Sequence, residues 1–168
     1  MEIYMMQHGD ALPKDKDPER GLSPEGENQI RLSAKALKRL QVHFDLIVSS
    51  PKKRARQTAE IVARELGYPE DQIELTETLE PLSPATEAVS YLKSFVAKER
   101  VFLAGHLPSL PEIASVLMSE SRISIQFEMG GVCRIDVEKL PTHEGKLRWY
   151  LTPEHLGLLA QLPPEATK

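Results

Sequence analysis

The sequence predicts a single α/β domain, a three-layer α/β/α sandwich built around a mostly parallel central sheet. Short apolar runs without polar–apolar alternation recur along the chain, and such runs are typical of strands buried on both faces. Amphipathic helical segments separate these runs, which is the order that produces parallel strands with helices on both faces. After residue 119 the strands alternate instead, and this change predicts an antiparallel strand addition near the C-terminus.

Three central strands are expected where the apolar residues run almost without interruption. These runs cover residues 3–6, 44–48 and 101–104. Residues 132–137 alternate between apolar and polar side chains, so one face of that strand is expected to meet the core. Residues 146–151 are expected to pair with it across a turn that contains Gly145.

Four amphipathic segments are expected to form helices. Their apolar faces are Ile30, Ala34 and Leu37; Ala55, Ala59, Val62, Ala63 and Leu66; Ala88, Leu92, Phe95 and Val96; and Leu110, Ile113, Ala114 and Leu117. The first helix, residues 24–40, begins with a serine N-cap and a proline at the first helical position. Ser50-Pro51 and Ser83-Pro84 repeat this start signal, so Ser50 is expected to cap the next helix.

Composition limits what the chain can be. A single domain over residues 1–158 fits the length of 168 residues, and residues 159–168 are expected to form a loose tail. With 21 basic and 25 acidic residues the net charge is −4, so no nucleic-acid binding is expected. The single cysteine, Cys133, excludes an internal disulfide framework, and we expect no metal and no cofactor. No membrane span and no secretory signal are evident, so a cytoplasmic protein is expected.

Polar residues follow each predicted central strand at its carboxyl end. Gln7-His8-Gly9 follows the first strand, Ser49 to Arg54 the second, and Gly105-His106 the third. In doubly wound sheets the ligand crevice lies just outside these strand ends. His8, Arg54 and His106 are therefore expected to meet there if the three strands are neighbours.

Two histidines beside an arginine suit the transfer of a phosphoryl group. Arginine binds phosphate oxygens bidentately, and a neutral histidine can attack phosphorus with its lone pair. A second, protonated histidine can stabilise the oxygens of the moving group. Gly9 is expected to let the phosphate approach the backbone closely, and helix N-termini at Pro51 and Pro108 add partial positive charge.

Four sequence blocks, in the same order, resemble those of the histidine phosphatase superfamily, the phosphoglycerate mutase-like proteins. They are Gln7-His8-Gly9, Arg20 to Gly26, Ser49 to Ala59, and Gly105-His106-Leu107-Pro108. The third block, with its serine-proline, arginine-alanine and glutamine-threonine pairs, is the closest match. The small size of the chain is similar to the SixA-type phosphohistidine phosphatase branch.

The resemblance implies that His8 is the nucleophile and becomes transiently phosphorylated. It implies that Arg20, Arg54 and His106 are phosphate ligands, while Gln7 stands where the superfamily has an arginine. Glutamine donates hydrogen bonds without a charge, which lowers phosphate stabilisation by about 1–2 kcal/mol, or about tenfold in rate. The neighbouring Lys52, Lys53 and Arg56 are expected to be solvated.

No general acid is evident in the sequence. Asp10, Asp15, Asp17 and Glu80 are candidates only because they are near the motifs. An alkoxide leaving group needs such an acid, whereas a protonated imidazole leaves a phosphorus–nitrogen bond readily near neutral pH. The missing acid therefore favours phosphohistidine over a phosphate ester as the substrate.

Three functions follow from these observations. The first is a phosphatase that hydrolyses phosphohistidine on a partner protein through a phosphohistidine on His8. The second is a phosphomonoesterase of the same superfamily acting on a small phosphorylated substrate; residues 76–83 offer little chain for the lid that such an enzyme needs. The third, suggested by Gln7, is a module that binds phosphohistidine or phosphate without turnover.

Overall fold

The computed structural model describes residues 1–163. In chain order the strands and helices are β1 (Glu2–Gln7), α1 (Pro24–Arg39), β2 (Leu46–Ser49), α2 (Lys53–Leu66), β3 (Glu74–Leu75), α3 (Ala85–Leu92), β4 (Arg100–Gly105), α4 (Ser109–Met118), β5 (Val132–Asp136), β6 (Lys146–Leu151) and α5 (Pro153–Gln161). Short 3₁₀ turns lie at Glu70–Gln72, Glu77–Leu79 and Lys93–Phe95.

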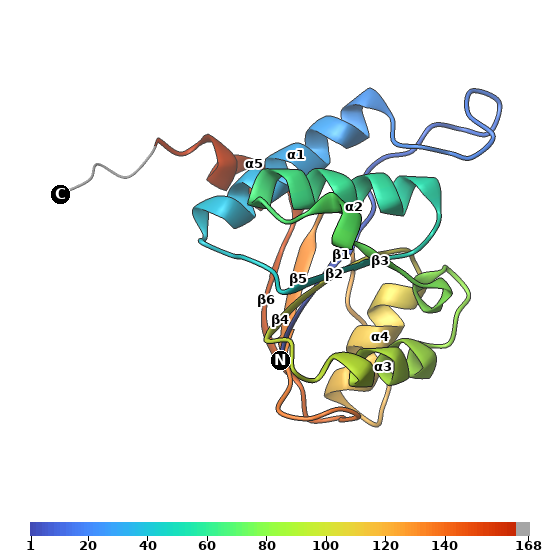
Figure 1. The fold of residues 1–168 in the computed structure, drawn as a ribbon, viewed down its shortest axis with the longest axis vertical. Helices are drawn as coiled ribbons and strands as arrows, with labels where there is room; N and C mark the ends of the chain where they lie inside the picture. The colour runs from blue at the N-terminus through green and yellow to red at the C-terminus, as the bar shows by residue number, and fades with distance from the viewer. Residues whose placement is uncertain (164–168) are drawn as a thin grey trace.

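The strands form one six-stranded sheet in the order β3-β2-β4-β1-β5-β6. The pairs β3–β2, β2–β4 and β4–β1 are parallel, whereas β5 and β6 join β1 as antiparallel strands. Helices α1, α2 and α5 cover one face of the sheet, and α3 and α4 cover the other (Figure 1). The predicted three-layer α/β/α class is therefore confirmed, with the antiparallel strands at the C-terminal edge.

Strand β1 is buried on both faces, which explains its continuous apolar run. Ile3 and Met5 pack into the layer formed with α3 and α4, while Tyr4 and Met6 pack into the layer formed with α1 and α2. Fully burying one such aliphatic side chain contributes about 1.5–3 kcal/mol. This two-sided packing fixes β1 in the interior of the sheet, between β4 and β5.

The helix starts differ in part from expectation. Ser23 caps α1 as expected, since its hydroxyl accepts the backbone N–H of Gly26 at 3.0 Å. Ser50 and Ser83 do not cap α2 and α3, whose N-cap residues are Lys52 and Pro84 without a side-chain bond. Their hydroxyls are engaged elsewhere, and that of Ser83 donates to the carbonyl of Glu77 at 2.6 Å.

Val96 was expected on the buried face of the third helix but is exposed. Helix α3 ends at Leu92, and the 3₁₀ turn Lys93–Phe95 that follows has about three residues per turn. This change of period moves Val96 off the apolar face. Strand β3 was not predicted, because its two residues are exposed and carry no apolar pattern.

The expected loose tail is wrong for residues 159–161, which complete α5. The hydroxyl of Thr152 accepts the N–H of His155 at 3.3 Å and so caps this helix. Leu156 is fully buried in the layer beneath α1, and Leu159 packs against the same layer. Residues 164–168 of the expected tail lie outside the described residues. Within residues 1–163, no helix has the length and apolarity needed to cross a membrane.

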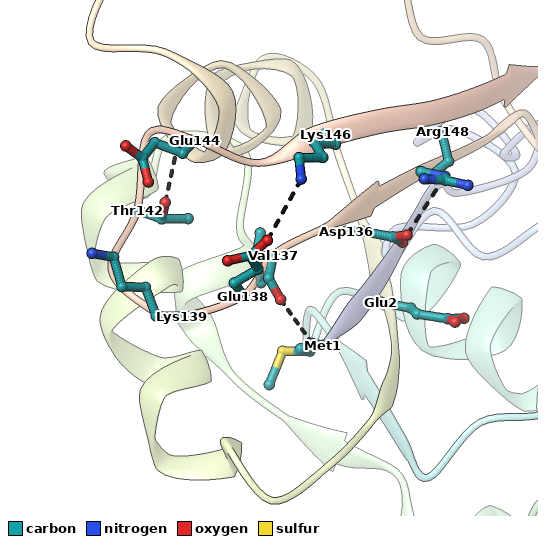
Figure 2. Close-up of a pocket in the computed structure, with 10 residues that line it drawn as sticks. All are labelled: Met1, Glu2, Asp136, Val137, Glu138, Lys139, Thr142, Glu144, Lys146 and Arg148. Atoms are coloured by element: carbon teal, nitrogen blue, oxygen red, sulfur yellow. Dashed lines mark hydrogen bonds and ion pairs between the residues drawn. The ribbon is translucent and has the colours of Figure 1, made fainter.

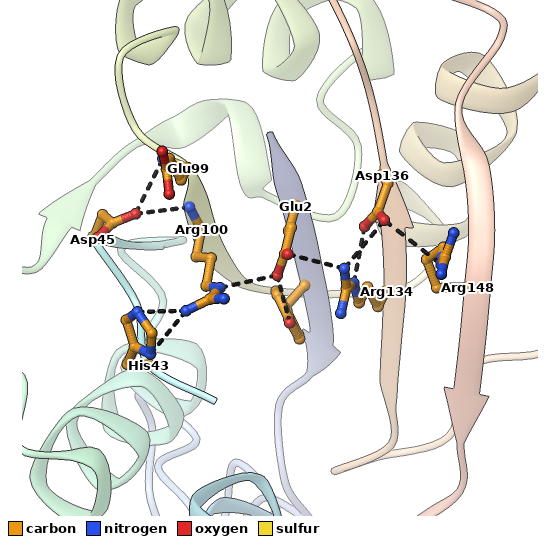
Figure 3. Close-up of polar contacts among 9 residues, drawn as sticks. Glu2, His43, Asp45, Glu99, Arg100, Arg134, Asp136 and Arg148 are labelled. Carbon is orange, nitrogen blue, oxygen red and sulfur yellow. Dashed lines mark hydrogen bonds and ion pairs between the residues drawn. The ribbon is translucent and has the colours of Figure 1, made fainter. Parts of the chain in front are cut away.

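A row of charged side chains crosses the sheet at the end remote from His8 (Figure 3). Glu2 on β1 bonds Arg100 of β4 at 3.1 Å and Arg134 of β5 at 2.9 Å. Arg134 also bonds Asp136 at 2.8 Å, and Arg148 of β6 lies 3.6 Å from the same carboxylate. These pairs connect β4, β1, β5 and β6 at this end of the sheet, away from the candidate site.

Candidate active site

The register of β1 and β4 places the two histidines side by side. Gln7 pairs with Gly105, so His8 and His106 are the next residues on adjacent parallel strands. Their ring centroids are 4.9 Å apart, with the rings inclined at 61°. Ser50 follows β2 at the same level, since its N–H donates to Ala104 at 3.0 Å. The strand ends therefore meet as the sequence predicted.

His8 presents a lone pair on Nε2. Its Nδ1 lies 2.7 Å from the carbonyl oxygen of Gly9, and because a carbonyl only accepts, Nδ1 carries the hydrogen. Nε2 then accepts a hydrogen bond from Nε of Arg54 at 2.9 Å. Burial, together with the charges of Arg54 and Arg20, lowers the pKa of His8 to about 4, although the bond to Gly9 opposes this. At neutral pH the ring is in its nucleophilic form.

His106 is oriented by Ser50. Its Nε2 lies 2.9 Å from the Ser50 hydroxyl, which accepts the N–H of Lys52 at 3.3 Å. Ser50 is fully buried, and within residues 1–163 its hydrogen has no other acceptor than Nε2 of His106. Ser50 is therefore the donor, and the hydrogen of the neutral His106 ring resides on Nδ1.

The expectation of a protonated second histidine is not met. Burial lowers the pKa of His106 to about 3, with further contributions from the charges of His8, Arg54 and Lys52. The ring is neutral at pH 7. It can nevertheless donate a hydrogen bond, because the tautomer set by Ser50 leaves a hydrogen on Nδ1, which has no partner among residues 1–163.

Helix α2 positions Arg54 through Thr58. The Thr58 hydroxyl donates to the carbonyl of Arg54 at 2.8 Å and accepts the N–H of Gly9 at 3.3 Å. This buried side chain thus connects the first turn of α2 to the backbone beside His8. Burial and the nearby charge of Arg20 lower the pKa of Arg54; a guanidinium nevertheless remains charged at neutral pH.

Arg20 lies on a loop that is fastened at several points. Its φ of 53° is in the left-handed region, and its Nε donates to the carbonyl of Leu12 at 3.4 Å. Gln57 of α2 accepts the N–H of Leu22 at 2.7 Å, and Asp17 accepts the N–H of Gly21 at 2.9 Å. Strain of this kind is retained where surrounding structure enforces it, commonly at functional sites.

Arg20 and Arg54 line one open cleft of about 440 Å³. Its other lining residues are Lys14, Pro18, Glu19, Pro51, Lys52 and Lys53. Lys52 and Lys53 were expected to be simply solvated, but Lys53 bonds Asp17 at 2.8 Å and Lys52 bonds Glu80 at 3.1 Å. Five of the eight lining residues are cationic, so the cleft is suited to an anion.

Gly9 is required for a different reason from the one expected. A Cβ at Gly9 would lie 2.8 Å from both the carbonyl oxygen of Gly26 and the Cγ1 of Ile30. The N-terminal part of α1 therefore packs directly on this residue. Gly26 is equally confined, because its Cβ would lie 2.1 Å from the carbonyl oxygen of Asp10. Both glycines serve the close approach of α1 to the strand end.

Buried polar atoms without partners gather at this end of the sheet. Among the described residues they are Gln7 Oε1, Gln29 Oε1, His106 Nδ1 and Ser109 Oγ. Gln7 ends β1, His106 follows β4 and Ser109 begins α4. Buried polar groups are almost always hydrogen-bonded, so this concentration indicates a place that receives a polar ligand.

The acidic candidates are all remote from the histidine pair or engaged elsewhere. Asp10 accepts the hydroxyl of Ser23 at 2.6 Å, and Glu80 pairs with Lys52. The hydrogen bond from Lys53 lowers the pKa of Asp17, with smaller contributions from backbone N–H groups. Asp15 is exposed. Among residues 1–163 there is no group of three histidine, cysteine or acidic side chains placed to hold a metal ion.

Sequence reasoning missed Ser50 and Thr58 as site residues. Ser50 could have been found by the strand-end rule that selected His8, since it directly follows β2. Thr58 lies four residues after Arg54, on the same side of α2. Cys133, by contrast, is a fully buried residue of β5, as expected for a small core side chain.

The family model for the histidine phosphatase superfamily (branch 1) matches residues 3–82. An uncharacterized protein of Picosynechococcus sp. (strain PCC 7002) is 37% identical over 123 residues, covering 70% of this chain and 73% of that protein. The chain belongs to the histidine phosphatase superfamily.

Within that superfamily the chain is SixA-like. The phosphohistidine phosphatase SixA of Escherichia coli (strain K12) is 27% identical over 161 residues, which cover 94% of this chain and 98% of SixA. The solved structure of the protein histidine phosphatase SixA with tungstate has a TM-score of 0.82 at 26% identity and covers 93% of this chain and 99% of that one. An α-ribazole-5′-P phosphatase structure from Escherichia coli K-12 shares the fold, with a TM-score of 0.75 at 15% identity over 91% of this chain and 97% of that one. The chain is thus a SixA-like phosphatase of the superfamily.

Proposed function

We propose that this protein hydrolyses phosphohistidine on a partner protein, with His8 as the covalent nucleophile. The observation that carries the proposal is the tautomer of His8. Nδ1–H is fixed on the Gly9 carbonyl, so Nε2 is the nitrogen with a lone pair. Nε2 accepts a hydrogen bond from Arg54, and the His8 ring lies beside the ring of His106. In the proposed mechanism this nitrogen is the attacking atom, and the neighbouring arginine and histidine support it as groups that can hold phosphoryl oxygens.

In the first step the Nε2 lone pair of His8 attacks phosphorus. The phosphorus–nitrogen bond of the substrate breaks, and the substrate histidine, whose phosphorylated ring carries a proton on its other nitrogen, leaves as neutral imidazole. Arg54 exchanges its hydrogen bond to Nε2 for bonds to phosphoryl oxygens, and Arg20 contributes a second guanidinium from the same cleft.

The remaining phosphoryl contacts come from neutral groups. His106 donates its Nδ1–H to a further oxygen. Gln7 adds neutral hydrogen bonds, and the backbone at Gly9 anchors the ring.

In the second step water attacks the phosphorus of phospho-His8. The phosphorus–nitrogen bond breaks, the electron pair returns to Nε2, and both hydrogens of the water depart with the phosphate as H₂PO₄⁻. His8 keeps its Nδ1 hydrogen on Gly9 throughout, so the ring ends as it began. No protein base is needed in this sequence.

The state of the carboxylates supports a phosphohistidine substrate over a phosphate ester. An ester oxygen needs a proton from a general acid as it leaves. Asp10 and Asp17 are held by Ser23 and Lys53, and Glu80 is paired with Lys52, so each of these three side chains is already engaged with another group. An imidazole leaving group requires no such donor.

The test measures phosphate release from a protein carrying phosphohistidine, with p-nitrophenyl phosphate run in parallel. Native protein should release phosphate mainly from the first substrate, and His8→Ala should abolish release. His155→Ala, which removes an exposed histidine of α5, is the matched control and should retain activity. Rapid quenching of the native reaction should trap an acid-labile, base-stable phosphoryl group on His8.

The other two functions correspond to defined outcomes of this experiment. Preference for p-nitrophenyl phosphate would replace the proposal with a small-molecule phosphomonoesterase. Phosphate binding without release, and without a trapped phospho-His8, would replace it with a binding module. In that case Gln7→Arg, which supplies the charge that the superfamily has at this position, would be the variant to examine.

A further inference from the structure

We infer that the rim of the candidate site is a docking surface for a partner protein whose phosphohistidine is flanked by acidic residues on one side and apolar residues on the other. This inference rests on the proposed function. The new element is the set of side chains next to the phosphohistidine that the partner protein must present.

One half of the rim is basic. Lys14, Lys52 and Lys53 surround Arg20 and Arg54 in the cleft of about 440 Å³. Lys53 and Lys52 have acidic partners, but within residues 1–163 Lys14 and Arg20 form no ion pair. A phosphoryl group needs only the two arginines and the histidines, which leaves Lys14 as an exposed cation without a ligand. In a chain whose net charge is −4, this local excess of positive charge favours an acidic partner.

The other half of the rim is apolar and exposed. Leu107, which directly follows His106, is 42% exposed, and Met129, which bridges to Gln7, is 39% exposed. Leu82 is 89% exposed and lies two residues beyond Glu80, the partner of Lys52. All three exposed apolar side chains lie on segments that adjoin the charged site, and apolar groups gathered beside polar ones are typical of interaction surfaces.

The combination points to a protein. A small phosphate ester would be enclosed by a pocket, whereas this cleft is open and the neighbouring Leu82, Leu107 and Met129 are exposed. Protein interfaces place apolar and flexible side chains such as methionine and leucine beside charged residues that orient the partner. The two halves of the rim therefore define the side chains that should flank the phosphohistidine.

The cleft at the far end of the sheet differs from the basic half of the rim, because it has mixed charge. A cleft of about 720 Å³ lies there, beside the first residues of β1, and its lining residues include Glu2, Asp136, Glu138, Lys139 and Lys146 (Figure 2). Acidic and basic side chains alternate in it, and Lys146 bonds Glu138 at 3.5 Å. A lysine in this region, Lys139, is accordingly a suitable control for Lys14.

The experiment uses two synthetic phosphohistidine peptides, phosphorylated with phosphoramidate, of sequence Glu-Glu-Glu-pHis-Leu-Leu and Lys-Lys-Lys-pHis-Leu-Leu, which differ only in the charged side. Native protein should have a KM for the acidic peptide at least tenfold lower than for the basic one, with similar kcat values. Lys14→Glu should raise the KM for the acidic peptide about tenfold, and this increase should exceed any change in the KM for p-nitrophenyl phosphate. Leu82→Asp should also raise the peptide KM, while Lys139→Glu and Leu158→Asp, an exposed leucine on α5, should have no effect.

The outcomes separate this inference from the proposed function. Turnover of both peptides with equal KM, or an equal effect of Lys14→Glu and Lys139→Glu, overturns the docking surface and leaves phosphohistidine hydrolysis intact. If no peptide is hydrolysed, binding of the acidic peptide to His8→Ala by calorimetry still measures the surface. Equal binding of the acidic and basic peptides in that measurement also overturns it.

Discussion

The two buried histidines should make the protein markedly less stable in mild acid. An unfolded histidine titrates near pH 6.5, whereas the folded pKa is about 4 for His8 and about 3 for His106. At pH values between the folded and the unfolded pKa, the unfolded chain binds protons that the folded chain does not. The free energy of unfolding therefore falls as pH falls. From pH 7 to pH 5 each histidine accounts for a loss of about 2 kcal/mol, since one pKa unit corresponds to about 1.4 kcal/mol. Together they account for about 4 kcal/mol, a large part of typical domain stability.

Urea unfolding of the native protein and of His8→Gln at pH 7 and pH 5 measures this effect. Glutamine does not titrate, so the variant should lose about 2 kcal/mol less than native protein between the two pH values. With a urea dependence of about 2 kcal/mol per molar, the difference is about 1 M in midpoint. His155→Gln, at an exposed position of α5, should keep the full native decrease. An identical decrease for native protein and His8→Gln would refute the assignment of a neutral, buried His8.

Three further predictions concern substitutions at Ser50, at the two glycines Gly26 and Gly157, and at Gln7. Ser50→Ala should lower kcat about fivefold with little change in KM, because about 1 kcal/mol of orientation of His106 is lost, and an unaltered kcat would contradict its positioning role. Gly26→Ala should destabilise the protein by about 1–3 kcal/mol in thermal unfolding, since the new Cβ would meet the Asp10 carbonyl. Gly157→Ala in α5, with open space around it, should instead be neutral or stabilising by up to about 1 kcal/mol, and equal effects of the two would argue against the packing explanation. Gln7→Arg should raise kcat about tenfold if Gln7 contacts the phosphoryl group, and steady-state kinetics showing no gain would remove Gln7 from the site.

The layers of the fold could be predicted because burial dictates the pattern of the strands. Residues 3–6 are apolar without alternation, and in the structure Ile3 and Tyr4 face opposite layers. The same reasoning could not detect β3, because a two-residue edge strand has no apolar face to reveal it. Helix α5 carried the signal that identified α1, a hydroxyl residue followed by proline at Thr152-Pro153, but the later prolines suggested a loose segment instead.

The candidate site could be predicted as a set of residues but not as a set of hydrogen bonds. The strand-end rule brought His8 and His106 together, and the register of β1 with β4 fulfils it. The bond between Ser50 and His106 depends on where β2 ends relative to β4, which no local pattern encodes. The requirement for Gly9 likewise comes from α1, whose packing distance is a property of the tertiary structure.

The pairing of β1 with β4 also determines when activity can arise during folding. Glu2 pairs with Arg100 and Gln7 with Gly105, so the contacts that set the two histidines beside each other join residues 98 positions apart. Contacts of such long range form late and slowly, because the intervening chain must first lose its freedom. Neither an early hairpin nor an isolated helix can contain a partly formed site. Recovery of catalytic turnover after dilution from denaturant would therefore report that the β1–β4 pairing has formed. An N-terminal fragment that ends before β4 could not hold both histidines.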